Sequence, residues 1–208
     1  PLGRPPKRTD QRLRILNCAA KSIATLGFEL CSLADIATEL DLTRPALYHY
    51  FSTKQQIFTE IALTAVQGNY EYVSKAVARI RKEKHSSVEL LRTLMTSHAE
   101  YFDENYWMVN ATIAGYGGIA RRELERIEEI EQSRDDYRDL LKQILIDGMT
   151  KGELRKTDAD ISGRAIFQLL NITRWYRPGG DRHAVDIALE NFNLVIGGLS
   201  VANSSSGN

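Results

Sequence analysis

Residues 32–54 read S-L-A-D-I-A-T-E-L-D-L-T-R-P-A-L-Y-H-Y-F-S-T-K, and this stretch predicts two short helices joined by a tight turn. Ser32 and Thr43 are hydroxyl N-cap candidates, and the apolar residues after each of them recur at helical spacing. Pro45 falls in the first turn of the second helix, where its missing N–H leaves no hydrogen bond unmade. Two helices around a short turn are typical of a helix-turn-helix motif, whose second helix enters the major groove of DNA.

The second helix of this pair has a core face and a free face. Leu47 and Phe51, four residues apart, are expected in the core. The free face carries polar and aromatic side chains together with one small residue: Arg44, Ala46, Tyr48 and His49. Ser52-Thr53-Lys54-Gln55 then has the S-x-x-Q pattern of a capping box and is expected to open another helix.

The run from Leu33 to Phe58, L-A-D-I-A-T-E-L-D-L-T-R-P-A-L-Y-H-Y-F-S-T-K-Q-Q-I-F, resembles the DNA-binding domain of TetR-family transcriptional regulators. The resemblance covers residues 12–58, and its L-Y-x-Y-F-x-x-K core is specific. Asp41 stands where the family usually has a glycine in the turn. Because aspartate tolerates the left-handed conformation better than most residues, we expect a slightly strained turn and an intact motif.

The resemblance implies a dimer whose two recognition helices read a roughly palindromic operator in successive major grooves. It places DNA contacts on Thr43, Arg44, Pro45, Ala46, Tyr48, His49, Tyr50 and Lys54. Arg44 is the candidate for base readout, since a guanidinium can bind guanine through two hydrogen bonds, and Ala46 can contact a thymine methyl. Tyr48 and Lys54 suit phosphate contacts. Ser32 and Thr43 can add further phosphate contacts from the helix N-termini.

The charge distribution favours a nucleic-acid partner at one end of the chain, although the net charge is zero. Residues 1–14 hold five basic side chains against Asp10 alone: Arg4, Lys7, Arg8, Arg12 and Arg14. A basic arm on a near-neutral body suits phosphate contact. We therefore expect residues 1–9 to be a flexible basic arm that contacts DNA through Arg4, Lys7 and Arg8. A solubilising tail is the alternative.

Composition argues against several other classes of protein. With 43% hydrophobic and 26% charged residues, the chain has the composition of a soluble globular protein. No apolar run is long enough to span a membrane and no secretory segment is visible, so a cytoplasmic location without a membrane partner is expected. Cys18 and Cys31 fit no metal-ligand spacing and are expected to be buried, reduced thiols. No catalytic arrangement has supporting context; we expect no enzyme, no metal and no cofactor, and we interpret His98 as structural.

The sequence predicts an all-α fold of about nine helices, in which a three-helix head with the helix-turn-helix precedes a helical-bundle regulatory body. Residues 10–53 would form the head, and residues 54–200 the ligand-binding and dimerisation domain. Residues 201–208 would be a disordered tail. Asp10 is the expected cap of the first helix, and Gly27 its left-handed end. The expected buried stripe of that helix is Leu13, Leu16, Ala20, Ile23 and Ala24.

A long amphipathic helix from Lys54 to about Ile80 is expected to join head and body. In the body, Gly115-Tyr116-Gly117-Gly118 should break helix and make a flexible corner, and a charged helix should run from Arg121 to Gly152. The last two helices, at residues 158–176 and 184–199, are apolar over more than one stripe, which suggests burial against a second subunit. The expected dimer-interface residues are Phe167, Leu170, Phe192, Val195 and Ile196.

The resemblance also implies an effector pocket in the body. Aromatic, soft and polar residues expected to line it are Trp107, Met108, Tyr116, Phe167, Asn171, Arg174 and Trp175. A largely apolar lining with a few polar groups suits a small apolar effector, although an ordinary core has the same composition. The phrase W-Y-R-P-G-G at residues 175–180 resembles lipid-responsive members of the family, which favours an acyl or steroid-derived thioester.

The resulting hypothesis is a ligand-responsive transcriptional regulator, acting as a repressor that binds a palindromic operator as a dimer and is released by its effector. Two alternatives stay open. One is an activator with the same architecture. The other is an all-helical, ligand-binding dimeric protein without specific DNA binding.

Overall fold

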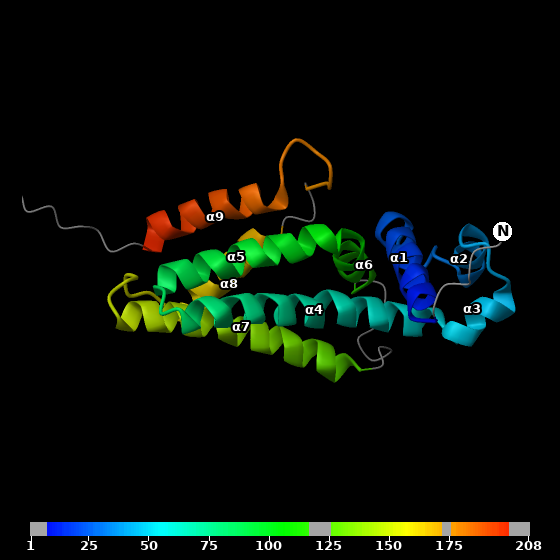
Figure 1. Cartoon of the computed structure of the whole chain (residues 1–208), viewed down its shortest axis with the longest axis horizontal. Helices are drawn as coiled ribbons and strands as arrows, with labels where there is room; N and C mark the ends of the chain where they lie inside the picture. The colour runs from blue at the N-terminus through cyan, green and yellow to red at the C-terminus, as the bar shows by residue number, and fades with distance from the viewer. Residues whose placement is uncertain (1–7, 117–125, 172–175, 200–208) are drawn as a thin grey trace, which may run out of the picture. The chain divides into compact units, whose positions relative to one another are not determined.

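A computed structural model describes residues 8–116, 126–171 and 176–199, without the side chains of Arg8, Thr9 and Tyr116. Its helices are α1 (Arg8–Leu26), α2 (Leu33–Glu39), α3 (Arg44–Tyr50), α4 (Lys54–Lys82), α5 (Ser87–Glu104), α6 (Tyr106–Tyr116), α7 (Ile127–Thr150), α8 (Ala159–Leu170) and α9 (Ala184–Leu199) (Figure 1). The predicted all-α fold is thus confirmed. Among the described residues, no helix combines the length and apolarity that crossing a membrane requires.

Backbone contacts divide the chain into two compact units. The first unit is Pro1–Gly68 with Asn105–Gln132, and the second is Asn69–Glu104 with Ser133–Asn208. Helix α4 therefore contributes its first half to one unit and its second half to the other. The expected boundary between head and body, at residues 53 and 54, is based on function and not on backbone contacts, and it stays a prediction.

The first unit is built on the three-helix arrangement expected for the head. Helix α1 packs against α6, and α2 and α3 pack against each other. Leu47 and Phe51 are fully buried, as predicted, together with Ile57, Phe58 and Ile61 on the inner face of α4. Helix α3 is thus fixed to the core by one face only, and its other face is available.

Local sequence signals place the two short helices. The Ser32 hydroxyl accepts a hydrogen bond from the backbone N–H of Asp35 at 3.1 Å, and the Thr43 hydroxyl accepts one from Ala46 at 3.3 Å. Both predicted N-caps are therefore confirmed. Gly27 and Asp41 have φ values of 88° and 54°, so both predicted left-handed positions are confirmed as well.

Three details of the head differ from the prediction. Helix α1 begins at Arg8, so Asp10 lies in its first turn and does not cap it. Leu13 is 53% exposed because the buried face of α1 is centred on Ile15, Ala19 and Ile23, with Leu13 at its edge. The capping box is one residue later than expected. Gln56 N–H donates to Thr53 Oγ1 at 3.1 Å, and Gln56 Oε1 reaches back to accept from the Ser52 N–H, one residue before this cap, at 2.9 Å.

Both cysteines lie in the core of the first unit. Cys18 is 8% exposed, Cys31 is 2% exposed, and both are free thiols, as predicted. Burial away from water, reinforced by the nearby Glu39 carboxylate, raises the pKa of the Cys18 thiol to about 12.

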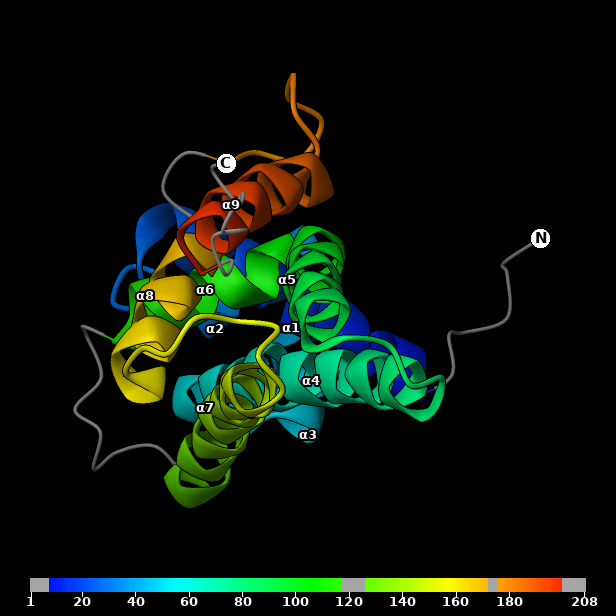
Figure 2. The same cartoon turned by 90° about the vertical axis from the view of Figure 1, so that its left-hand side faces the viewer.

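The second unit contains the end of α4 and most of α7 together with α5, α8 and α9. Helix α9 lies along α5, as both views show (Figures 1 and 2). The core of this unit draws on all five helices, with Val73, Leu94, Ile144, Ile166 and Phe192 among its buried side chains. Asp158 caps α8 by accepting hydrogen bonds from the backbone N–H groups of Asp160 and Ile161.

Three helix boundaries differ from the prediction. Helix α6 continues through Gly115, where an added Cβ would overlap the ring of Phe58; glycine thus permits close packing there and does not break the helix. Helix α8 ends at Leu170 and not near residue 176, because Asn171 leaves the helical conformation as its C-cap. Helix α7 is described from Ile127, so its expected start at Arg121 and the glycines 117 and 118 lie outside the described residues.

Candidate nucleic-acid interface and effector site

The free face of α3 presents the predicted DNA-contacting side chains. Arg44, Pro45, Tyr48 and His49 are exposed, and the Tyr48 ring is 52% exposed. Ala46 and Tyr50 are half-buried, with Tyr50 packed against the core. Tyr50 is consequently a support for the recognition helix more than part of its outer surface.

A surface hollow includes Arg44 and Tyr48 from the free face of α3. It has a volume of about 410 Å³ and is lined by Glu29, Cys31, Ser32, Leu33, Ala34, Arg44, Tyr48 and Lys54. Four of the predicted DNA contacts therefore lie together: Ser32, Arg44, Tyr48 and Lys54. Hydroxyl, guanidinium, phenol and ammonium groups are those that bind phosphate oxygens in protein–DNA complexes.

Lys54 is held at this hollow by contacts within the protein. Its ammonium donates to the backbone carbonyls of Phe28 at 2.7 Å and Glu29 at 3.1 Å, and it lies 4.3 Å from the centre of the Phe28 ring. An ammonium has three donors, so one remains for a phosphate. Lys54 can therefore position a phosphate while its own side chain stays fixed.

Arg12, counted with the basic arm on sequence grounds, is a structural residue. Its guanidinium forms a bidentate ion pair with Glu60 and donates to the Tyr50 carbonyl at 2.9 Å. It also stacks over the Phe51 ring at 4.1 Å. Arg12 thus joins α1, the end of α3 and α4. Arg4 and Lys7, and the side chain of Arg8, lie outside the described residues.

The predicted effector residues are distributed over both units. Met108 is a buried core residue of the first unit, where Trp107 is 42% exposed with its ring against Tyr106. Phe167 and Asn171, both exposed, belong to the second unit. Arg174 and Trp175, and the side chain of Tyr116, lie outside the described residues. The structure therefore does not test whether these seven residues line one pocket.

A polar cluster in the second unit was missed by sequence reasoning. Nδ1 of His98 on α5 lies 2.8 Å from the Tyr137 hydroxyl on α7 and 3.4 Å from the Asn69 amide nitrogen on α4. The Phe167 ring from α8 packs edge-on against both Tyr137 and His98, with ring centres 5.5 and 6.3 Å apart. Four helices thus contribute to one cluster. The residues of this cluster are far apart in the sequence, so no local sequence motif predicts the cluster.

Burial keeps this cluster uncharged. It lowers the pKa of His98 to about 4 and raises the pKa of the Tyr137 phenol. Near neutral pH the histidine is therefore an imidazole and the tyrosine a phenol. The cluster offers hydrogen bonds without a formal charge.

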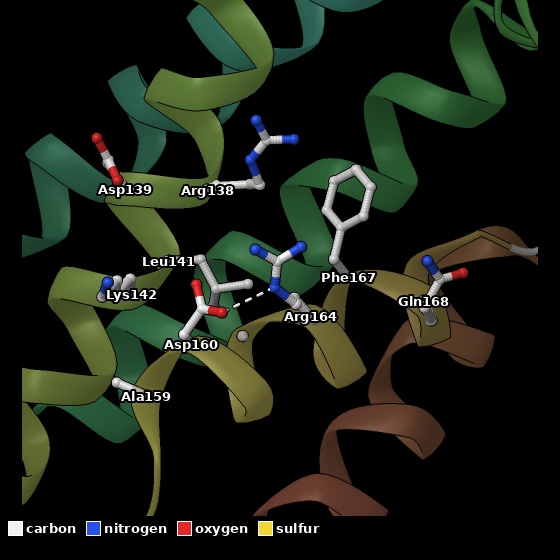
Figure 3. A pocket seen from close by; sticks show the side chains of 10 residues that line it. Arg138, Asp139, Leu141, Lys142, Ala159, Asp160, Arg164, Phe167 and Gln168 are labelled. Atoms are coloured by element: carbon white, nitrogen blue, oxygen red, sulfur yellow. Dashed lines mark hydrogen bonds and ion pairs between the residues drawn. The ribbon is translucent and has the colours of Figure 1, made fainter.

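A second hollow, of about 250 Å³, lies between α7 and α8 (Figure 3). Its lining is Arg138, Asp139, Leu141, Lys142, Ala159, Asp160, Gly163, Arg164, Phe167 and Gln168. Arg164 is ion-paired with Asp160 at 2.8 Å, and Arg138 is paired with Asp135. Phe167 is therefore shared between this charged hollow and the uncharged cluster.

The predicted dimer residues divide into buried and accessible ones. Leu170 and Phe192 are buried inside the second unit, and Val195 and Ile196 pack partly against the same core. The large apolar side chains exposed on α8 and α9 are Ile161, Phe167, Leu169 and Leu194. Of the residues predicted for the interface, Phe167 is thus the one that the protomer leaves well exposed.

Two family models match most of the chain. The model described as bacterial regulatory proteins, tetR family, matches residues 15–61. The model described as tetracyclin repressor-like, C-terminal domain, matches residues 84–199.

Individual relatives match over nearly their full length. The HTH-type transcriptional repressor KstR2 of Mycolicibacterium smegmatis is 25% identical over 203 residues, which cover 94% of each chain. The crystal structure of the TetR-family regulator PfmR from Thermus thermophilus is 34% identical with a TM-score of 0.78, and covers 88% of this chain and 96% of that one. The structure of AibR in complex with isovaleryl coenzyme A and operator DNA has a TM-score of 0.73 over 88% of this chain and 97% of that one. At 23% identity, this last likeness shows the fold alone.

Proposed function

This chain belongs to the TetR family of ligand-responsive transcriptional regulators, and we propose that it is a repressor that binds a palindromic operator as a homodimer and is released by a small, largely apolar effector. The observation that carries the proposal is the free face of α3. Arg44 and Tyr48 are exposed there, on a helix fixed to the core by Leu47, and both line a hollow with Ser32 and Lys54. A regulator of this kind acts on DNA in the cytoplasm and needs no catalytic site.

Within the interface, each residue has a distinct role. Arg44 reads a guanine through two hydrogen bonds, and Ala46 contacts a thymine methyl. Tyr48, Lys54, Ser32 and Thr43 position the phosphate backbone without specifying sequence. Pro45, His49 and Tyr50 complete the surface, and Arg4, Lys7 and Arg8 of the arm add salt-dependent affinity.

The effector is proposed to be an acyl or steroid-derived thioester. Support comes from the curated KstR2 relatives, whose solved counterpart is described as a ketosteroid regulator, and from the isovaleryl coenzyme A bound to AibR. This ligand keeps as its candidate contacts Trp107, Met108, Tyr116, Phe167, Asn171, Arg174 and Trp175. It would act by its higher affinity for the state that fits the operator poorly, a coupling typically worth about 1–3 kcal/mol.

Dimerisation is proposed to use α8 and α9. Their exposed apolar side chains Ile161, Phe167, Leu169 and Leu194 need a covering surface, and a second copy provides one. Phe192, Leu170, Val195 and Ile196 then act beneath the interface by shaping α8 and α9 from within.

Selection of binding sites from random duplex DNA, followed by affinity titrations at two salt concentrations, tests the proposed function. We expect a palindromic consensus and tight, salt-dependent binding. Weak binding without a consensus would favour the alternative, a ligand-binding dimer that does not recognise DNA sequence.

The variant Arg44→Ala sharpens this experiment. Loss of a bidentate base contact should cost about 1–3 kcal/mol of specific affinity and relax one operator position. Arg92→Ala, which removes an exposed arginine from α5 in the second unit, is the matched control and should bind like the parent protein. An unchanged sequence preference in Arg44→Ala would reject Arg44 as the base-reading residue.

A further inference from the structure

An unpaired acceptor lies inside the second unit. Asn69 is 8% exposed, and its side-chain Oδ1 is buried without a hydrogen-bond partner among the described residues. A buried polar atom that lacks a hydrogen-bond partner is destabilising, and a ligand or a water molecule can supply that partner. The amide nitrogen of the same side chain faces His98, which makes Asn69 part of the polar cluster.

The hydrogen bonds of the cluster determine which nitrogen of His98 carries its proton. Nδ1 faces the Tyr137 hydroxyl and the Asn69 amide nitrogen, and both of these groups can donate. With Nδ1 as the acceptor, the proton of the neutral ring lies on Nε2. No acceptor for this second nitrogen is found in the described part of the chain. The cluster thus has a buried, unpaired acceptor on Asn69, and the half-buried His98 ring has a donor at Nε2 beside it in the same cluster.

Phe167 connects the cluster with the surface. Its ring packs on Tyr137 and His98 on one side, and it lines the hollow between α7 and α8 on the other (Figure 3). The side chain is 37% exposed, so Phe167 is the residue through which the cluster adjoins the charged hollow.

We propose that Asn69, His98 and Tyr137 bind an uncharged group of the effector that both donates and accepts hydrogen bonds, a hydroxyl or a primary carboxamide, and that they exclude the corresponding carboxylate. A carboxylate has no proton for Asn69 Oδ1 and would bring an uncompensated charge into a buried site. The inference deepens the proposed function and rests on it, because it assigns the polar end of the same effector. It predicts that the apolar body of that effector carries a hydroxyl or amide in addition to any thioester.

Three ten-carbon probes with a common apolar chain test the inference: decan-1-ol, decanamide and decanoate. We would measure their affinities for the full chain near neutral pH by calorimetry, together with the shift that each causes in Tm. The alcohol and the amide should bind more tightly than the carboxylate, on the order of tenfold or more. Asn69→Leu should remove most of this preference while the protein stays folded, because the substitution removes a buried polar atom and keeps a side chain of similar size.

Gln143→Leu is the matched control, since it deletes an exposed amide from α7 in the same unit and should leave the preference unchanged. Decanoate binding as tightly as decanol, an unchanged preference in Asn69→Leu, or no binding of any probe would each overturn the inference. Operator binding, measured on the same protein preparation, tests the proposed function separately. A protein that binds its operator but does not distinguish the probes would reject the inference alone.

Discussion

The two units of this protein present their polar groups in opposite ways. In the first unit, Arg44 and Tyr48 stand exposed on a short helix that Thr43 caps at its N-terminus. In the second unit, Asn69 and Tyr137 are buried beside His98, and they come from three different helices. An outward polar face can bind a charged polymer in water, whereas an inward cluster selects a small uncharged group. The contrast suggests a division between reading DNA and sensing a ligand within one short chain.

The largest effect on this comparison is expected from a substitution in the core of the second unit. Phe192→Asp should destabilise the protein by about 4 kcal/mol or more, because it creates a cavity and buries a carboxylate. Leu194, two residues away on α9, is 72% exposed. Leu194→Asp should therefore keep the fold and yield monomers in sedimentation experiments. A folded, dimeric Leu194→Asp variant would mean that α9 does not form the interface. Urea unfolding separates the two effects.

A change of pH tests the inward cluster through His98. The ordinary pKa of histidine is 6.5, and burial lowers that of His98 to about 4 in the folded protein. Between these values the unfolded chain binds a proton that the folded protein does not. The free energy of unfolding should therefore be at its full value above pH 6.5 and fall by about 3 kcal/mol as the pH drops to 4.

Urea unfolding of the parent protein and of His98→Gln across this pH range measures that contribution. The variant should lose the His98 part of the pH dependence, while the exposed-histidine control His183→Gln should retain it. Parallel curves for the parent and His98→Gln would show that His98 titrates normally in the folded protein.

The smallest effect is expected in the head. Arg12→Ala removes the ion pair with Glu60, the hydrogen bond to the Tyr50 carbonyl and the stacking on Phe51. Because both charged side chains are only partly buried, the cost should be about 1–2 kcal/mol. Operator affinity should fall with it, since Arg12 supports the end of α3. Lys75→Ala, which breaks the exposed Lys75–Glu71 pair, should change neither quantity measurably.

The head could be predicted from the sequence in most respects because its signals are local. N-caps at Ser32 and Thr43, and left-handed turns at Gly27 and Asp41, each depend on a few neighbouring residues. Where two neighbouring residues could form the same contact, the prediction is wrong by one position. Ser52 and Thr53 both offer a hydroxyl, and Gln55 and Gln56 both offer an amide, so the capping box was placed one residue early.

In the body, the helices could be predicted from the sequence, but the residues that form the polar cluster could not. His98 was interpreted as a structural histidine because its own helix carries no sign of Tyr137, which follows 39 residues later, or of Asn69, which precedes it by 29. The same holds for Arg12 and Glu60, which are 48 residues apart. Burial on α8 and α9 was also ambiguous, since both helices are apolar on more than one side. The tertiary packing then decided that Phe192 lies inside and Leu194 outside.

The two buried thiols have a practical consequence for labelling experiments. Alkylating reagents attack the thiolate form of cysteine. Burial raises the pKa of Cys18 to about 12, so this buried side chain is a protonated thiol near neutral pH. Cys31 is only 2% exposed, although it lies in the lining of the hollow beside α3. A maleimide spin label or fluorophore should therefore react first with a cysteine introduced at an exposed position, without removal of the native ones. Pairs of such labels would measure the distance between the recognition helices of the proposed dimer, with and without a candidate effector.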